Sequence, residues 1–471
     1  MKIAVGNSYS KVLECNNEEN KFLDHILSVP MPGHKFMPAF KAGSWDGLKR
    51  FYSTAYKTFP TGFLPFIIGQ SEKEKFKVFT DDKRNVPALQ DPTRINEKYP
   101  HLRDYQVKGL TDILTSSLRS ENQVLPWQRG VARFQTGTGK TLMAACLTDF
   151  IGKRTLFIVE RRELMYQSID VFKTQTKMSV GAFGDGKEEL DGDIIFCMVQ
   201  TIESKFPTFT KLLPNIVLLV IDECHHSSKG IYHKIASKCQ APFRIGLSAT
   251  PLKRGDLGDV YLIGDCGEII AEGDREEIQS KGYIAKPKIY IFTIKEPLEA
   301  RLSYKMAYNT LIVNNDTRND LIIQAVKKLR EKNKSILVLI RIIEHGKILE
   351  RMIKKSGINC LFVSGKDSMV VRKQAKEAIA SKNLSVLIAS SIWDEGVDAP
   401  LLDAGILAGG GASDIKSIQR VGRILRPKEG SNIVYIIDFK DMTNKYLLNH
   451  SMARIKAYED EKFDISYPKS L

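Results

Sequence analysis

The sequence lacks the features that would place it in a membrane or in an oxidising compartment. No stretch approaches the ~20 uninterrupted apolar residues that a membrane-spanning helix requires, and the opening segment MKIAVGNSYSKVLE has no apolar core of a secretory signal. The 471 residues include only seven cysteines, none in a Cys-x-x-Cys pair and none spaced with histidine as zinc ligands. These absences exclude a disulfide scaffold and a zinc module, and they predict a cytoplasmic protein with reduced thiols and no membrane partner.

Acidic residues are outnumbered by basic ones. The chain has 70 Lys and Arg against 55 Asp and Glu, a formal net charge of +15. Its composition, 43% hydrophobic and 27% charged, is ordinary for a folded protein and excludes wholesale disorder. The basic excess favours a polyanionic partner, with nucleic acid ahead of an acidic membrane surface.

Short apolar runs alternate with helical patterns through most of the chain, which predicts a doubly wound α/β fold. Continuous apolar runs are typical of parallel strands that are covered on both faces. The predicted strands are 155–159, 194–199, 216–221, 245–247, 335–340, 360–363, 385–389, 404–407 and 433–437. They fall into two groups, separated by a polar segment at 273–289 that is interpreted as a linker. The expected domains are 1–95 (a small α+β accessory DNA-binding domain), 96–285, 286–455 and a C-terminal tail at 456–471.

A segment rich in glycine and threonine, QTGTGKT, occupies residues 135–141. It lies between a predicted strand and an apolar helical pattern, which is the context of a phosphate-binding loop. Backbone N–H groups and the helix N-terminus would face the phosphates of ATP. Lys140 is expected to bind the β- and γ-phosphates and Thr141 to hold Mg²⁺; the other loop contacts are assigned to Thr136, Gly137, Thr138 and Gly139. Phe134 stands where the strict pattern has glycine.

Two further groups of residues fit the same chemistry. Asp222 and Glu223 follow an apolar strand, so they are expected at the carboxyl edge of the sheet. There Asp222 would position Mg²⁺ and Glu223 would orient or deprotonate the attacking water. Arg423 and Arg426 lie three apart on one predicted helix face. Alone they would indicate a basic surface helix; beside the phosphate loop they are interpreted as arginine fingers for the γ-phosphate.

The order of these motifs over about 100–440 resembles that of the superfamily 2 helicases, whose loops relax the glycine replaced by Phe134. The motifs that carry the resemblance are LRDYQ at 102–106 (Q motif), RREL at 161–164 (Ia), QT at 200–201 (Ic), DECH at 222–225 (II, DExH type), SAT at 248–250 (III), SS at 390–391 with EGVD at 395–398 (V) and 419–426 (VI). The resemblance implies two RecA-like motor domains in tandem that use ATP and Mg²⁺.

The resemblance also implies a role for each motif residue. It assigns nucleotide contacts to Arg103, Gln106, Gly396 and Asp398, with Gln106 binding the adenine edge. It assigns Gln419 to the catalytic residues, together with Lys140, Glu223, Arg423 and Arg426. Coupling of the ATP site to nucleic acid falls to His225, Ser248 and Thr250. Nucleic-acid contacts fall to Arg161, Arg162, Gln200, Thr201, Ser390 and Ser391. Arg341 and Trp393 are further candidates, against the alternatives of a solvated basic helix and a packed core tryptophan.

The N-terminal segment resembles that of the phage UvsW-type helicases, through KFMPAF at 35–40 and WDGLKRFY at 45–52. Basic and aromatic residues alternate there, which suits a surface that holds phosphate and stacks bases. Trp45, Lys49 and Arg50 are the assigned DNA contacts. The alternative, favoured for Phe36, Phe40 and Phe51, is that the aromatic side chains form the core of a small domain. A chain starting near residue 96 is expected to keep nucleic-acid-stimulated ATPase activity but to lose much of its affinity for branched DNA and of its unwinding of such DNA.

The predicted function is therefore an ATP-dependent DNA helicase or translocase. The UvsW-type resemblance implies a phage-encoded enzyme, in the host-cell cytoplasm, that unwinds or branch-migrates forked and junction DNA in recombination, repair or replication. Its partners would be branched DNA with a single-stranded tracking strand, and replication or recombination proteins. The alternatives are a double-strand RNA helicase or sensor, a translocase that does not separate strands, and a nucleic-acid clamp with an inactive ATPase.

Overall fold

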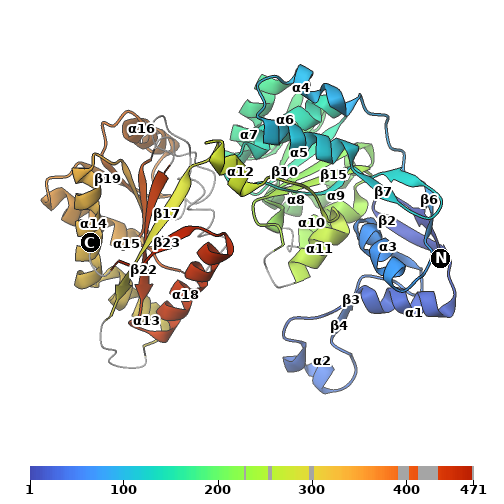
Figure 1. Cartoon of the computed structure of the whole chain (residues 1–471), viewed down its shortest axis with the longest axis horizontal. Coiled ribbons are helices and arrows are strands. Elements are labelled where there is room, and N and C mark those ends of the chain that lie inside the picture. Colours follow the sequence, from blue (N-terminus) through green and yellow to red (C-terminus); the bar gives the residue numbers. More distant parts are fainter. Residues whose placement is uncertain (227–229, 253–256, 296–301, 391–401, 412–432, 469–471) are drawn as a thin grey trace. The chain divides into compact units, whose positions relative to one another are not determined.

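The computed structural model divides into two compact units (Figure 1). One comprises Met1–Gln135 with Gly139–Asp274, and the other comprises Arg275–Leu471 with Thr136–Thr138. The structure describes residues 1–226, 230–252, 257–295, 302–390, 402–411 and 433–468. Each unit is built on a large, mainly parallel sheet. The fold is α/β, with two tandem RecA-like motor domains and an α+β segment at the N-terminus.

The N-terminal segment forms a four-stranded sheet in the order β5-β2-β1-β6 and a two-stranded ribbon of β3 and β4. Its elements are β1 (Lys2–Val5), β2 (Tyr9–Glu14), α1 (Asn17–Ile26), β3 (Ser28–Pro30), α2 (Pro38–Lys41), β4 (Leu48–Arg50), β5 (Thr58–Pro60), α3 (Leu64–Lys73) and β6 (Phe79–Asp82). The helix α1 begins with a capping box, in which Asn16 and Glu19 bond each other's backbone N–H.

The first motor sheet has eight strands in the order β12-β11-β13-β10-β14-β15-β9-β16. Its strands are β9 (Arg129–Arg133), β10 (Thr155–Val159), β11 (Val180–Gly184), β12 (Lys187–Glu188), β13 (Ile194–Met198), β14 (Leu218–Asp222), β15 (Phe243–Ser248) and β16 (Ile269–Glu272). A separate ribbon pairs β7 (Ser117–Arg119) with β8 (Val124–Pro126). The helices are α4 (Ile95–Lys98), α5 (Asp104–Thr115), α6 (Lys140–Ile151), α7 (Arg162–Gln175), α8 (Val199–Ser204), α9 (Phe206–Thr210), α10 (Gly230–Lys238) and α11 (Leu257–Asp265).

The second unit has a seven-stranded parallel sheet in the order β19-β20-β18-β21-β22-β17-β23. Its strands are β17 (Lys286–Ile294), β18 (Ile336–Leu339), β19 (Cys360–Val363), β20 (Val386–Ala389), β21 (Ala404–Leu407), β22 (Ile433–Asp441) and β23 (Asp464–Ser466). The helices are α12 (Arg275–Ser280), α13 (Tyr304–Tyr308), α14 (Asp316–Glu331), α15 (Ile343–Lys355), α16 (Met369–Ala380) and α18 (Lys445–Asp460). Successive residues of β18 enter two different core clusters, so the sheet is buried on both faces.

The N-terminal segment does not stand apart from the first motor sheet, contrary to the expected boundary at residue 95. Its core includes Leu125 and Trp127, and the ring of Phe51 lies 5.1 Å from that of Tyr261 on α11. The buried guanidinium of Arg244 on β15 donates a hydrogen bond to Ser8 Oγ at 2.9 Å. A cut at residue 96 would expose this apolar surface and remove this acceptor, so the shortened chain is expected to be destabilised, contrary to the tolerance expected from the sequence.

Two other expected boundaries also differ from the structure. The segment 273–289 contains α12 and the start of β17 rather than an open linker. The expected tail at 456–471 begins inside α18 and continues into β23, which pairs with β17. Tyr458 and Phe463 are buried in the core of the second unit, so this part of the chain completes the sheet.

The cysteine side chains form no disulfide bond in the part of the chain that the structure describes. All seven cysteines lie within the described ranges and are free thiols, six of them buried. Among the helices that the structure describes, none is long and apolar enough to cross a membrane.

Candidate functional site

The motif residues of the first unit lie at one edge of its sheet. The strands β13, β10, β14, β15 and β9 are consecutive neighbours and run parallel. Each strand ends, at its carboxyl end, in or just before a predicted motif. β13 leads to Gln200 and Thr201, β10 to Arg161 and Arg162, β14 to Asp222 and Glu223, β15 to Ser248 and Thr250, and β9 to the loop at 135–139. Ligands of open α/β sheets bind at this edge, so residues up to 115 positions apart in the sequence, from Gln135 to Thr250, form one candidate site.

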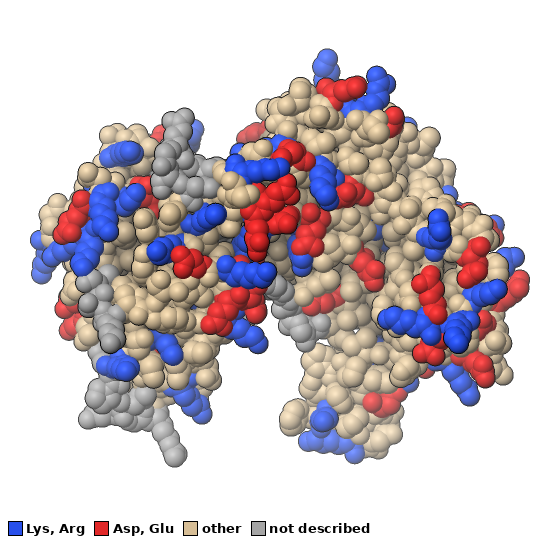
Figure 2. Space-filling model, viewed as in Figure 1, with Lys and Arg blue, Asp and Glu red and all other residues tan. Residues whose placement is uncertain are grey.

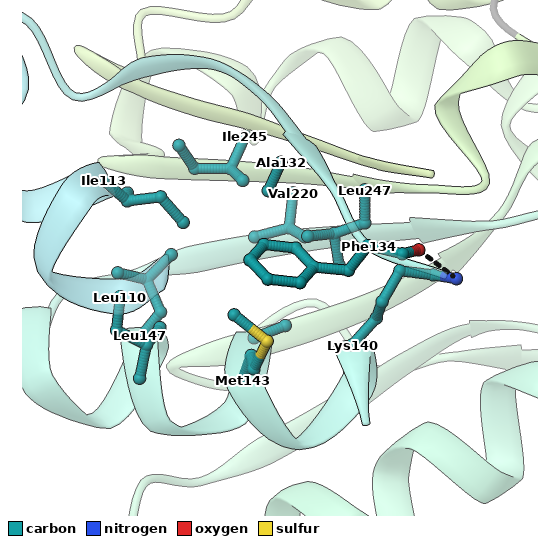
Figure 3. Close-up of a pocket in the computed structure, with 11 residues that line it drawn as sticks. Leu110, Ile113, Ala132, Phe134, Lys140, Met143, Leu147, Val220, Ile245 and Leu247 are labelled. Carbon is teal, nitrogen blue, oxygen red and sulfur yellow. Dashed lines mark hydrogen bonds between the residues drawn. The ribbon is translucent and has the colours of Figure 1, made fainter. Parts of the chain in front are cut away.

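The loop before α6 has the backbone of a phosphate-binding loop. Gly137 and Gly139 have φ angles of 87° and 80°, in the left-handed region that a side chain disfavours. Gly139 is the N-cap of α6, so the helix begins at Lys140. Lys140 Nζ donates to the Phe134 carbonyl oxygen at 3.3 Å (Figure 3). It also lies 3.9 Å from Glu223 Oε1. The lysine is therefore held at the loop, next to the carboxylate pair.

Phe134 is buried, and a glycine on the neighbouring helix α5 makes room for it. A Cβ placed on Gly109 would lie 2.4 Å from Phe134 Cζ and 2.9 Å from Met143 Cε. Figure 3 shows the Phe134 ring pointing into an apolar pocket between α5, α6 and the sheet, lined by Leu110, Ile113 and Met143 among others. Gly109 thus compensates for the bulky residue at the start of the loop, a role that the sequence analysis missed.

This packing predicts a compensating pair of substitutions. Gly109→Ala should destabilise the protein by about 1–3 kcal/mol, because overpacking outweighs the better helix propensity of alanine. In a Phe134→Leu background, where the ring end is gone, the same change should be neutral or stabilising. Urea unfolding of the four proteins measures the coupling; equal effects of Gly109→Ala in both backgrounds would contradict the proposed contact.

The carboxylate pair sits in an unusual electrostatic and backbone setting. Burial, and then the neighbouring Glu223, raise the pKa of Asp222 to about 7, while Lys140 lowers it. Asp222 Oδ1 accepts the Glu223 backbone N–H at 3.0 Å. Glu223 has a φ of 47°, a left-handed conformation that costs a residue other than glycine about 1–3 kcal/mol. A nearby cation would relieve the repulsion between these carboxylates.

Motifs II and III are joined by hydrogen bonds around Ser248. The buried side chains of His225 and Ser248 approach to 3.0 Å between Nδ1 and Oγ, and the Thr250 backbone N–H donates to the same Oγ at 3.1 Å. His225 Nδ1 also lies 3.3 Å from Glu223 Oε2. The Ser248 carbonyl oxygen accepts the Phe134 backbone N–H at 3.1 Å. The coupling residues predicted from the sequence therefore connect the carboxylate pair to the phosphate loop.

The Q-motif residues lie against the phosphate loop. Gln106 is buried on α5, and its Oε1 accepts the Arg103 backbone N–H at 3.0 Å. A Cβ on Gly139 would lie only 2.6 Å from Gln106 Nε2, so this loop glycine is also required for close approach. The adenine contact assigned to Gln106 remains a prediction.

The predicted nucleic-acid contacts of both units follow the carboxyl ends of parallel strands. Arg162 Nη1 contacts Asp185 Oδ1 at 3.2 Å, beside the Tyr166 hydroxyl, which donates to Asp185 Oδ2. In the second unit Arg341 follows β18 and donates to the Tyr304 hydroxyl at 2.8 Å, and the buried Ser390 follows β20. Arg341 thus belongs to a loop rather than to a basic helix.

Several predicted residues lie outside the described ranges. They are Ser391, Trp393, Gly396, Asp398, Gln419, Arg423 and Arg426. Their assignments stay predictions from the sequence.

The N-terminal candidates are partly engaged within their own segment. Trp45 Nε1 donates to the Leu48 carbonyl oxygen at 3.0 Å. Arg50 contacts Asp46 at 3.2 Å and Asp24 at 3.4 Å, whereas the half-buried Lys49 lies on β4. Two of the three assigned DNA contacts therefore have internal partners.

Family models match most of the two motor regions. Residues 99–253 match the type III restriction enzyme res subunit, and residues 317–428 match the helicase conserved C-terminal domain. The chain belongs to helicase superfamily 2. This superfamily 2 helicase is an ATP-dependent enzyme that acts on nucleic acid as a helicase or translocase.

Two similar proteins fit this assignment, and one solved structure shares the fold. The helicase is 26% identical to the ATP-dependent DNA helicase uvsW of Enterobacteria phage T4, over 96% of both chains. It is 26% identical to the DNA 3′-5′ translocase XPB2 of Sulfurisphaera tokodaii, over 70% of this chain and 79% of that one. The DNA-bound type ISP restriction-modification enzyme LlaBIII has a similar fold, with a TM-score of 0.59 and 17% identity, over 85% of this chain and 33% of that one.

Proposed function

We propose that this helicase is a DNA-directed motor of the DExH type that unwinds or branch-migrates forked and junction DNA in recombination, repair or replication. The observation that carries the motor assignment is the continuous sheet edge that runs from the phosphate loop through Ser248 and Glu223 to Arg161 and Gln200. The preference for DNA is supported by the T4 relative, which is named a DNA helicase and aligns over nearly the whole chain.

The residues of the site fit a magnesium nucleotide. Within the described ranges no three His, Cys, Asp or Glu residues gather as a metal site. Mg²⁺ in such enzymes needs fewer protein ligands, because nucleotide phosphates and water supply the others. Thr141 and Asp222 would hold it. The raised pKa of Asp222 supports this role, because a cation would stabilise the charged form of a buried carboxylate. When bound, Mg²⁺ neutralises charge on the β- and γ-phosphates.

Each side chain has a distinct role in the proposed hydrolysis. Lys140 binds the phosphate oxygens as a positive charge, and the N–H groups of the glycine loop orient them. Glu223 orients the attacking water and accepts its proton. His225 is hydrogen-bonded to Ser248, so it would transmit a change in the position or charge of Asp222 and Glu223 to the loop after β15, which is proposed to couple the ATP site to nucleic acid. Arg423 and Arg426 are proposed to stabilise the γ-phosphoryl group as it separates.

The adenine contact predicts a change in nucleotide selectivity. A site that hydrogen-bonds a base edge discriminates strongly against bases that lack the matching groups. Gln106→Ala should therefore raise KM for ATP and narrow the preference for ATP over GTP. Steady-state hydrolysis of both nucleotides by both proteins measures this. A parallel loss for ATP and GTP would instead assign Gln106 to supporting the loop at Gly139.

The choice between DNA and RNA is tested by stimulation of hydrolysis. Phosphate release should rise with single-stranded or forked DNA and much less with single- or double-stranded RNA of equal length and charge. Equal or greater stimulation by double-stranded RNA would replace the DNA assignment with the RNA alternative. No hydrolysis with any nucleic acid would favour a clamp. Hydrolysis without strand displacement would favour a translocase.

A further inference from the structure

The ribbon of β3 and β4 carries a small loop structure that we call the projecting lobe, residues 31–47. In Figure 1 it extends from the rest of the N-terminal segment. The lobe is held by its own contacts. The Met31 backbone N–H donates to the Gly47 carbonyl oxygen at 2.8 Å, and the rings of His34 and Phe40 meet edge-on at 4.9 Å. A Cβ on Gly47 would lie 2.6 Å from the His34 ring, so its base is closely packed.

The projecting lobe presents one aromatic side chain to solvent. Phe36 is 81% exposed, whereas Phe51, which the sequence argument had grouped with it, is buried in the core. The prolines at 30, 32 and 38 restrict the backbone on either side of Phe36. The side chain therefore sits on a preorganised support and loses little freedom when it meets a partner.

A single exposed phenylalanine is ordinary on a protein surface, but the charge around this one is not. Lys35 and Lys41 are exposed on the same lobe, and Figure 2 shows basic side chains at its tip. No acidic residue occurs between Asp24 and Asp46. An aromatic ring flanked by lysines, on a lobe whose one acidic residue is Asp46 at its base, matches the chemistry of an unpaired nucleic-acid strand.

We infer that the projecting lobe is a stacking element for unpaired DNA, in which Phe36 stacks on a base and Lys35 and Lys41 contact the adjoining phosphates. This inference deepens the proposed function and rests on it, because it identifies the single-stranded part of a fork or junction as the feature that the N-terminal segment recognises. It also assigns the DNA contact to Phe36, Lys35 and Lys41 at the lobe tip. Trp45 and Arg50, the contacts expected from the sequence, use their polar groups in hydrogen bonds within the segment.

Stacking makes a specific prediction about side-chain chemistry. Loss of one base–aromatic contact should weaken strand binding about ten-fold. Phe36→Ala should show that loss, Phe36→Trp should bind as well as the original or better, and Phe36→Leu should stay close to Phe36→Ala. A surface for an apolar protein partner would instead accept leucine. Because Phe36 is exposed, none of these changes removes core packing.

The experiment uses the full chain and a fork with 2-aminopurine at the first unpaired positions. Binding is measured without nucleotide, both as Kd and as the fluorescence quenching that base stacking produces. Tyr56→Ala is the matched control, because Tyr56 is 77% exposed in the same segment but lies outside the lobe. Quenching should be lost in Phe36→Ala, retained in Tyr56→Ala and restored in Phe36→Trp.

The phosphate contacts are tested by salt dependence. Lys35→Ala with Lys41→Ala should lower the slope of log Kd against log salt by about 1.4, as expected for two phosphates of a single strand. An unchanged slope together with full quenching in Phe36→Ala would overturn the inference. If the unaltered protein binds the fork and Phe36→Ala binds it equally, only the lobe assignment fails. If the unaltered protein does not bind DNA, the proposed function fails as well.

Discussion

Replacing Glu223 by glutamine should lower ATP turnover by about 10²–10⁴-fold while leaving nucleotide binding nearly intact. The amide keeps the size of the side chain but can no longer accept the proton of the attacking water. The lost interaction belongs mainly to the transition state, so kcat should fall and ground-state affinity should not. The strained φ of 47° at this position remains, so the fold should be as stable as before.

Phosphate release and fluorescent-nucleotide binding separate these effects. Glu97→Gln is a suitable control, because Glu97 is an exposed carboxylate on α4, outside the candidate site, that forms a surface ion pair with Arg94 at 3.6 Å. Glu223→Gly is a second informative change: it should also abolish turnover, yet relax the left-handed backbone and raise the free energy of unfolding. Normal hydrolysis by Glu223→Gln would remove this carboxylate from the catalytic role.

Lys140→Ala should abolish turnover by a different route, through loss of phosphate binding. The ammonium group is directed along the loop by the Phe134 carbonyl oxygen and by Glu223, so its removal also leaves two acceptors without their cation. One such charge contributes about 10²–10³ to the rate, and here it also supports binding. Nucleotide affinity should fall with kcat, in contrast to Glu223→Gln.

Nucleotide titration with Lys140→Ala, Lys140→Arg and Lys153→Ala tests this difference. Arginine keeps the charge but replaces the compact ammonium group by a planar fork, so it should restore binding only in part. Lys153 is exposed just beyond the other end of α6 and should be replaceable without effect. Undiminished ATP affinity in Lys140→Ala would contradict the assignment of the loop at 135–141 as the phosphate site.

The sequence predicted the inner strands of both sheets well, because their apolar runs are buried on both faces. Residues 155–159, 360–363 and 404–407 match β10, β19 and β21 at both ends. The missed strands are of another kind. β16 and β23 lie at sheet edges. β17 begins with Lys-Pro-Lys, so its apolar pattern starts late and its first residues resemble the end of a polar linker.

The candidate site was predictable where a local motif carries the chemistry, and not where distant residues pack together. Lys140, Asp222 and Ser248 each follow a predicted parallel strand, which is enough to place them at the carboxyl edge of a sheet. The contact of Gly109 with Phe134 and the strained backbone of Glu223 leave no local pattern, since they depend on the approach of α5 and on the turn after β14. Phe36 and Phe51 look alike in sequence, and only the fold separates an exposed ring from a core one.

The most direct test of the account is strand separation on three substrates measured side by side: a fork, a four-way junction and a blunt duplex of the same sequence, with ATP and Mg²⁺, using the unaltered protein and Glu223→Gln. The account predicts that the unaltered protein separates the strands of the fork and the junction and leaves the blunt duplex largely intact. It predicts that Glu223→Gln binds the branched substrates without separating their strands. Equal unwinding of all three substrates, or separation by Glu223→Gln at the normal rate, would contradict it.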